Sequence, residues 1–288
     1  MLTSRAPAKI NLTLRVLGRR TDGFHELESL VAFAGACDLV SLDPQRSFGL
    51  EVEGPTAEAA GPDSDNLIIR AARNLQKRVP NLVLGGFLLK KRLPVGAGVG
   101  GGSSDAAAAL RLLAELNGIP QDDPRIFEAA AETGSDIPVC LTPSARMFRG
   151  RGEKVSGHIE LPALAAVLVN PGVHISTPDV FRALKIEPGA SGPSTGPGVD
   201  VFTGGLPALV PLFERDTNDL EPAAIALSPV VAEALDALRR TPSVRFVRMS
   251  GSGATVFGLF DNCRHAARAA KAVKAAHPAW WVKPTVLR

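Results

Sequence analysis

Residues 94–107 read Pro-Val-Gly-Ala-Gly-Val-Gly-Gly-Gly-Ser-Ser-Asp-Ala-Ala, and this glycine-rich loop decides what the rest of the chain can be. Five glycines within seven residues leave almost no Cβ atoms, so the backbone can adopt angles that other residues avoid. The alanine- and leucine-rich run that follows, with Gly118 as its stop, predicts a helix over residues 103–117. Converging N–H groups and a helix N-terminus favour an anion, so the loop is predicted to bind a polyphosphate.

Three familiar phosphate-binding patterns do not fit this loop. A Walker A loop requires a lysine, and the loop has none. A dinucleotide fingerprint is matched by Gly96, Gly98 and Gly101, but residues 119–124 read as a turn where that fold needs a second strand. A protein-kinase loop leads into a strand, whereas a helix follows here. A flexible linker is the remaining alternative, and linkers do not usually cap a helix.

The loop resembles the ATP-binding loop of the GHMP kinases. Two further segments carry the same resemblance in the order that family shows, Ala6-Pro-Ala-Lys-Ile-Asn-Leu12 and Met249-Ser-Gly-Ser-Gly-Ala-Thr-Val-Phe257. Within the family, Arg20-Thr-Asp-Gly-Phe-His25 and Gly134-Ser-Asp-Ile-Pro138 are similar to members that phosphorylate 4-diphosphocytidyl-2-C-methyl-D-erythritol. The chain departs from those members at Phe24, where tyrosine is frequent, and at Val99, where leucine is commoner.

The resemblance implies an α+β, two-domain fold with the active site in the cleft between the domains. It further implies ATP and Mg²⁺ as cofactors, and transfer of phosphate to the 2-hydroxyl of that substrate in the non-mevalonate isoprenoid pathway, giving the 2-phosphate and ADP. One alternative is another small-molecule kinase of the superfamily, acting on homoserine or mevalonate. A second is an RNA-binding module, because the N-terminal layout of the superfamily resembles a ribosomal-protein domain. Balanced charge and the absence of tyrosine weigh against RNA binding.

Hydrophobic periodicity predicts a mixture of strands and helices in two domains, an ATP-binding domain at 1–160 and a substrate-side domain at 161–288. Strands are expected at 10–17, 26–34, 38–43, 47–53, 82–92, 145–149, 153–156, 164–170, 244–249, 254–260 and 280–287. Helices are expected at 66–79, with Asp65 as cap, and at 103–117, 124–133, 178–185, 206–213, 228–240 and 262–276. Residues 187–198 are rich in turn formers and are expected to be mobile.

Composition excludes several classes of protein. Lysine plus arginine number 32 and aspartate plus glutamate 29, so a net charge of +3 argues against a nucleic-acid partner. The three cysteines, Cys37, Cys140 and Cys263, lie far apart and form no Cys-x-x-Cys pair, which favours a reducing compartment over a disulfide framework. With no apolar signal core or membrane-length run, the chain is expected to be cytoplasmic and without a membrane partner. The sequence predicts no oligomeric state.

Asp136 and Lys9 are the predicted catalytic residues. Phosphoryl transfer needs charge neutralisation on the nucleotide and a group that accepts the proton of the acceptor hydroxyl. From the residues alone, Asp136 is equally a helix N-cap or a catalytic base, and the resemblance assigns it to catalysis. Lys9, also assigned by resemblance, would keep that carboxylate ionised and stabilise the alkoxide as it forms.

Substrate binding is assigned, mainly by resemblance, to Asn11, Phe24, His25, Thr177 and Phe181. A cytosine ring has two flat faces for aromatic side chains and an edge that a histidine and nearby backbone groups can read. We expect Phe24 and Phe181 to stack on opposite faces of that ring.

Nucleotide binding is assigned to the loop and to two residues outside it, and the whole set is Asn66, Lys91, Pro94, Gly96, Gly98, Gly100, Gly101, Gly102, Ser103 and Ser104. By resemblance, Asn66 contacts adenine. Ser104 and Asp136 are the candidate Mg²⁺ ligands, and the sequence does not decide between them. The segment Gly251-Ser-Gly-Ala254 alone reads as a hairpin turn, and the resemblance implies that it packs against the active site.

Overall fold

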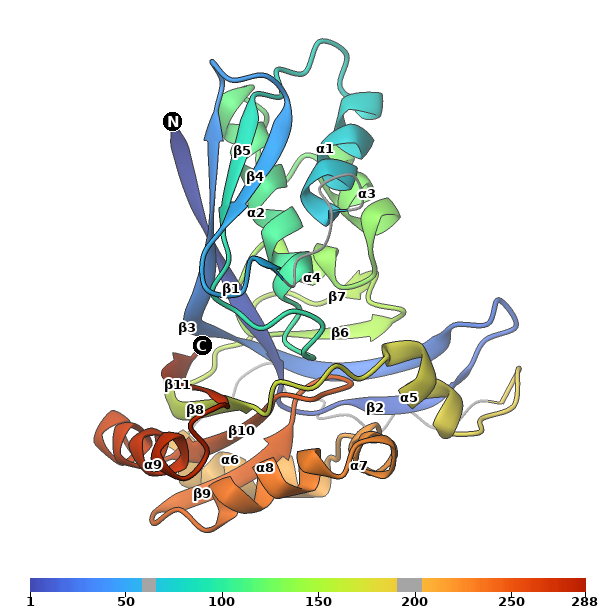
Figure 1. Cartoon of the computed structure of the whole chain (residues 1–288). Helices are drawn as coiled ribbons and strands as arrows, with labels where there is room; N and C mark the ends of the chain where they lie inside the picture. The colour runs from blue at the N-terminus through green and yellow to red at the C-terminus, as the bar shows by residue number, and fades with distance from the viewer. Residues whose placement is uncertain (59–65, 191–203) are drawn as a thin grey trace. The chain divides into compact units, whose positions relative to one another are not determined.

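The computed structural model describes residues 1–58, 66–190 and 204–288, and the chain forms two compact units (Figure 1). The first unit contains Met1–Lys9, Cys37–Val95 and Gly100–Pro143, and the second contains Ile10–Ala36, Gly96–Val99 and Ser144–Arg288. The units interleave along the sequence because two strands, β1 (Leu2–Asn11) and β3 (His25–Asp43), contribute residues to both.

The first unit is a small sheet with helices on one side of it (Figure 1). Its further elements are β4 (Gly49–Glu53), α1 (Leu67–Arg78), β5 (Gly86–Lys90), α2 (Gly101–Leu116), α3 (Pro124–Thr133) and α4 (Ile137–Cys140). Strand β5 pairs antiparallel with β3 and parallel with β4, and β1 pairs with β3. Helix α1 buries Ile68, Ile69 and Leu75 and packs on α2 and α3, which places the helical core of this unit.

Local sequence sets where the helices of the first unit begin. The side chain of Asn66 accepts a hydrogen bond from the Ile68 amide at 3.0 Å and so caps α1, while the predicted cap Asp65 lies outside the described residues. Gly100 has a left-handed backbone with φ 59°, which glycine adopts without strain. Helix α2 therefore begins at Gly101, two residues before its predicted start.

The second unit combines strands from the C-terminal part of the chain with β2 (Arg15–Arg19) and part of β3. Its further elements are β6 (Arg146–Gly150), β7 (Lys154–Val155), β8 (Leu164–Asn170), α5 (Thr177–Ala183), α6 (Gly205–Arg215), α7 (Glu221–Leu227), α8 (Val230–Arg239), β9 (Val244–Met249), β10 (Val256–Phe260), α9 (Cys263–Ala276) and β11 (Trp281–Leu287). The strands β11, β8, β10 and β9 pair antiparallel in that order, and β2 and β6 pair with β3. Helices α8 and α9 pack on these strands around a buried apolar cluster that includes Val167, Leu235 and Phe260.

The predicted α+β class is confirmed, and most predicted elements are present within a few residues of their expected bounds. Three predicted strands differ from the structure. The strand expected at 10–17 is interrupted, because β1 ends at Asn11 and β2 begins at Arg15, and the strands expected at 26–34 and 38–43 are one continuous β3. Residues 35–37 stay extended because β11 lies alongside them, where the Ala36 amide donates to the Thr285 hydroxyl at 3.1 Å.

The structure also contains two short helices that the sequence did not predict, α4 and α7, which have too few residues for a periodic pattern. The segment predicted to be mobile, 187–198, lies outside the described residues from residue 191 onward. Across residues 1–58, 66–190 and 204–288, we find no helix with the length and apolar character that a membrane span requires.

Candidate active site

Lys9 and Asp136, the predicted catalytic residues, form an ion pair within the first unit. The ammonium of Lys9 lies 2.8 Å from Oδ2 of Asp136. The Lys9 side chain is buried near the end of β1, whereas 41% of the Asp136 side chain is exposed. Asp136 stands at the N-cap position of α4, yet among the described residues its side chain makes no capping hydrogen bond. The carboxylate is thus held by a buried cation on one side and open to solvent on the other, as a proton acceptor requires.

The N-terminus of α2 lies against the side chain of Lys9. A Cβ atom built on Gly100 would come within 3.2 Å of Cε and 3.3 Å of Cβ of Lys9. The first N–H groups of a helix have no partner inside it, and they carry the positive end of the helix dipole. An ammonium beside such a helix end makes a site for a negatively charged group, here lined by exposed Gly102 and half-buried Ser103.

Two predicted nucleotide contacts, Ser104 and Lys91, point into the protein instead. Ser104 is 1% exposed, and its hydroxyl donates to the Pro7 carbonyl at 2.7 Å. Lys91 is 3% exposed, and its ammonium lies 2.6 Å from Oδ2 of Asp38 and 2.7 Å from Oδ2 of Asp105. The structure therefore does not bring these two side chains together with the exposed residues of the loop.

The buried cluster of Lys91, Asp38 and Asp105 lies directly behind the first residue of α2. A Cβ atom on Gly101 would meet the Lys91 ammonium at 3.2 Å. Burial raises the pKa of Asp105 to about 7 against the attraction of Lys91, and Oδ1 of Asp105 has no hydrogen-bond partner among the described residues. Burial alone would lower the pKa of Lys91, but the two carboxylates outweigh it and raise that pKa. Asp38 was not predicted, and its only sequence signal was a carboxylate opening an otherwise apolar strand.

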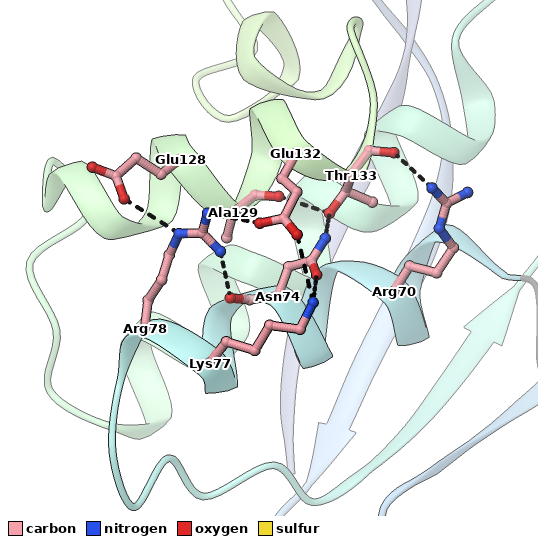
Figure 2. Close-up of polar contacts among 8 residues, drawn as sticks. All are labelled: Arg70, Asn74, Lys77, Arg78, Glu128, Ala129, Glu132 and Thr133. Atoms are coloured by element: carbon pink, nitrogen blue, oxygen red, sulfur yellow. Dashed lines mark hydrogen bonds and ion pairs between the residues drawn. The ribbon is translucent and has the colours of Figure 1, made fainter.

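Polar side chains join α1 to the end of α3, as Figure 2 shows. The buried amide of Asn74 donates to the Thr133 hydroxyl at 3.0 Å, and Arg70 donates to the Thr133 carbonyl at 3.4 Å. Arg78 pairs with Glu132 at 2.7 Å on the next turn. Because Thr133 directly precedes the segment that carries Asp136, α1 fixes the point at which the chain enters that segment. Sequence reasoning missed these contacts, although basic and amide side chains recur along α1.

In the second unit, the third glycine motif packs against residues 97 and 98 of the loop. The Ser250 hydroxyl donates to the Gly98 carbonyl at 2.9 Å, and the Thr255 amide donates to the Ala97 carbonyl at 3.1 Å. Gly98 has φ +73°, and a Cβ atom there would lie 2.4 Å from the Ser250 carbonyl oxygen. Asn218, which the sequence did not single out, supports the motif by donating to the Met249 and Gly251 carbonyls at 2.8 and 2.9 Å.

Asn11 and Thr177 both contact this motif. The backbone N–H of Asn11 donates to the Ser250 hydroxyl at 3.1 Å, and its side-chain nitrogen donates to the Ser29 hydroxyl at 2.8 Å. Its side-chain oxygen is buried and has no hydrogen-bond partner within the described part of the chain, although an amide oxygen can accept two. The Thr177 hydroxyl, at the start of α5, lies 2.7 Å from the Ser252 hydroxyl.

The predicted aromatic residues Phe24, His25 and Phe181 each have a close ring or cation neighbour. Phe181 stacks on His25, with ring centroids 4.7 Å apart and an interplanar angle of 23°. Phe24 is 48% exposed, and the guanidinium of Arg151 lies 4.5 Å from the centre of its ring. Burial and then the charge of Arg19 lower the pKa of His25, which favours the neutral ring. Arg151 was missed because no local pattern distinguishes it.

The remaining candidates are Asn66, Pro94 and Gly96. Asn66 uses its side-chain oxygen to cap α1, and Pro94 is half-buried at the loop entrance. Gly96 is exposed with φ +60°, and a Cβ atom there would meet the His174 ring at 2.6 Å.

The chain is similar to known proteins along most of its length. Residues 66–143 match the model of the GHMP kinases N terminal domain, and residues 206–279 match that of the GHMP kinases C terminal. The 4-diphosphocytidyl-2-C-methyl-D-erythritol kinases of Xanthobacter autotrophicus and Azorhizobium caulinodans are 59% and 55% identical to the chain, over 100% of it and 99% of each relative.

Two solved structures are also similar to the chain. A crystal structure of 4-(cytidine 5'-diphospho)-2C-methyl-D-erythritol kinase matches with a TM-score of 0.75 at 35% identity, over 99% of both chains. The mevalonate kinase of L. major in complex with R-mevalonate has a TM-score of 0.67 at 14% identity, over 100% of this chain and 96% of its own, and shares the fold. With family models on both halves and full-length relatives above half identity, the chain belongs to the GHMP kinase family.

Proposed function

We propose that this chain transfers the γ-phosphoryl group of ATP to the 2-hydroxyl of 4-diphosphocytidyl-2-C-methyl-D-erythritol, giving the 2-phosphate and ADP in the non-mevalonate isoprenoid pathway. One observation carries the chemistry, the contact between Lys9 and the half-exposed carboxylate of Asp136 beside the N-terminus of α2. The full-length identity to kinases of that name supports the substrate.

In this proposal each group of the site has a defined task. The N–H groups at the start of α2 and the glycine loop hold the phosphates of ATP. Asp136 accepts the proton of the 2-hydroxyl while that oxygen bonds to the γ-phosphorus and the bond to the ADP oxygen breaks. Lys9 keeps Asp136 ionised and stabilises the negative charge on the reacting oxygens.

Magnesium fits this site as an ion carried by the nucleotide. Within the described residues, no three His, Cys, Asp or Glu side chains are grouped to hold a metal. Mg²⁺ commonly uses one or two carboxylates together with phosphate oxygens, and Asp136 has such a carboxylate. Ser104 is the poorer candidate because its hydroxyl already donates to Pro7. When bound, the ion would neutralise charge on the phosphates.

The cytidyl end of the substrate is assigned to residues of the second unit. Asn11 offers a buried acceptor, and Phe24, His25 and Phe181 offer ring faces of the kind that bases stack on. The family models match on either side of residue 160, which supports an ATP-binding domain at 1–160 and a substrate-side domain at 161–288, whereas the second compact unit also takes residues 10–36, 96–99 and 144–160 from the first range. Three free cysteines support a reducing, cytoplasmic location.

The proposed function is tested by measuring ADP release with three acceptors, the cytidyl substrate, homoserine and mevalonate, at equal concentrations. We expect turnover with the first alone, and ³¹P NMR should place the new phosphate on the 2-oxygen. Asp136→Asn is the matched control for contaminating kinases. Turnover with homoserine or mevalonate exceeding that with the cytidyl compound would overturn the substrate assignment.

A further inference from the structure

Arg111 lies on α2, the helix that begins at the glycine loop, and it contacts both segments that carry the proposed catalytic residues. Its Nη2 donates to the Arg5 carbonyl at 2.7 Å and to the Ser4 hydroxyl at 3.1 Å, on the strand that leads to Lys9. Its Nη1 donates to the Cys140 carbonyl at 2.9 Å and the Leu141 carbonyl at 3.3 Å, at the end of the short helix that Asp136 begins.

A second side chain on the same face of α2 contacts the same two segments at a position closer to the glycine loop. Ser104 precedes Arg111 by seven residues, close to two helical turns, so the two lie on one face. Its hydroxyl donates to the Pro7 carbonyl at 2.7 Å and lies 3.5 Å from the sulfur of Cys140. Strand β1 and helix α4 are thus each fastened to α2 at two points, and they meet each other at the 2.8 Å contact between Lys9 and Asp136.

We propose that Arg111 is a positioning residue that sets the separation of Lys9 and Asp136. The planar guanidinium has five donors in a fixed plane and can hold two segments in a set relation, whereas the donors of an ammonium rotate about one bond and reach less far. Its carbonyl partners on α4 are the groups that a helix end leaves without partners, so the contact also orders that end. Burial lowers the pKa of Arg111, and partial desolvation strengthens the hydrogen bonds it makes.

This inference rests on the proposed function, because it assigns Arg111 to the same catalytic pair. The neighbouring polar network of Figure 2 differs from it, since Asn74 and Arg70 hold only the entry to the Asp136 segment. Ser104 also contacts both segments, but among the contacts described above only Arg111 donates to backbone carbonyls on the strand of Lys9 and at the end of α4. A misplacement of about 1 Å in a reacting group can cost on the order of 10²-fold in rate.

The test compares Arg111→Met with Arg111→Lys and with a control, Arg78→Met. Arg78 also comes from a helix of the first unit and donates to a backbone carbonyl, that of Asn74 at 2.9 Å. We expect Arg111→Met to lower kcat about 10- to 100-fold while KM for ATP and Kd for ADP, measured by calorimetry, change less than about twofold. Hydrogen exchange of residues 134–141 should rise in this variant. Arg78→Met should keep kcat.

Arg111→Lys keeps the positive charge and serves as the second variant if the methionine variant does not fold. Its kcat should stay about 10-fold low, because the shorter side chain with one nitrogen cannot reproduce the four hydrogen bonds of the guanidinium. Wild-type kcat in either Arg111 variant would overturn the inference, as would a rise in KM for ATP that matches the fall in kcat. A wild-type chain that does not phosphorylate the cytidyl substrate would instead overturn the proposed function. In that case the hydrogen exchange of residues 134–141 still tests the role of Arg111. Exchange in Arg111→Met equal to that of the wild type would overturn the positioning role.

Discussion

The carboxylate of Asp136 lies 2.8 Å from the ammonium of Lys9, although Asp136 stands at the N-cap position of α4, where an aspartate side chain ordinarily caps the helix. The two roles that the sequence left open for Asp136 therefore separate in the structure. Its backbone occupies the capping position and its side chain is committed to the lysine. We expect its substitution to affect chemistry more than stability.

Asp136→Asn is expected to lower kcat by about 10²- to 10⁴-fold, because the amide cannot accept the hydroxyl proton. Affinity for ATP should change little, since the first turn of α2 and the loop are unaltered. Steady-state kinetics with calorimetric titration of a non-hydrolysable nucleotide measures both quantities. A variant that keeps half of the wild-type kcat would exclude Asp136 as the base.

Gly98→Ala is expected to lower Tm by several degrees and to weaken ATP binding. The new Cβ would lie 2.4 Å from the Ser250 carbonyl oxygen, in a backbone conformation, φ +73°, that costs other residues about 1–2 kcal/mol. Gly102→Ala in the same loop is the control, since its Cβ would only touch Leu67 at 3.4 Å. Thermal denaturation of the two variants side by side checks this, and equal Tm values would contradict it.

Phe24→Ala is expected to raise KM for the cytidyl substrate about fivefold or more, as loss of a stacking ring costs ~1–3 kcal/mol. With 48% of its surface exposed, Phe24 adds little to the core, so Tm should hold. Phe24→Tyr keeps the ring and should be near neutral. A lowered Tm with unchanged KM would show instead that Phe24 serves the fold.

Asp105→Asn is expected to remove part of the pH dependence of stability. The folded pKa of about 7 lies above the reference value of 3.8, so the folded state binds one more proton between these values. The contribution of Asp105 to the free energy of unfolding is complete below about pH 4. It is lost as the pH rises to about 7, by up to ~1.4 kcal/mol per pH unit. Urea denaturation from pH 5 to 8 should show the wild type losing more stability than the variant, and parallel curves would contradict the assignment.

Cys140 is expected to resist alkylation at pH 8. Burial raises the pKa of its thiol to about 11, against the opposing effects of Lys9 and Ser104, so thiolate is scarce. Cys263 is exposed at the start of α9 and serves as the internal control. Peptide mass spectrometry after a short treatment with iodoacetamide should find the label on Cys263, and equal labelling of Cys140 would refute its burial.

Sequence reasoning succeeded where a short segment determines both structure and chemistry. The glycine loop and the following alanines predicted a phosphate-binding turn and a helix, and α2 is that helix. The segments around Lys9 and Asp136 were identified separately, 127 positions apart by residue number, and they meet in the structure. Their resemblance to a known family supplied what periodicity alone could not.

Sequence reasoning did not predict the contacts of side chains that depend on distant partners. Ser104 and Lys91 lie close to the loop in sequence, yet tertiary contacts turn both inward, toward Pro7 and toward Asp38. Asn218 and Arg151 contact residues far from them in the chain, so no local spacing marks them. Helix α4 is too short for a periodic pattern to predict.

The polar contacts between α1 and α3 have a consequence for how the helices align. Small apolar side chains such as Ala129 and Ala130 would tolerate a slide of α3 by one turn, about 5.4 Å along its axis. Hydrogen bonds from Asn74 and Arg70 to Thr133 fix one register and penalise every other. A few polar side chains on α1 thus determine the position at which α3 ends and the segment Gly134-Ser-Asp136 begins.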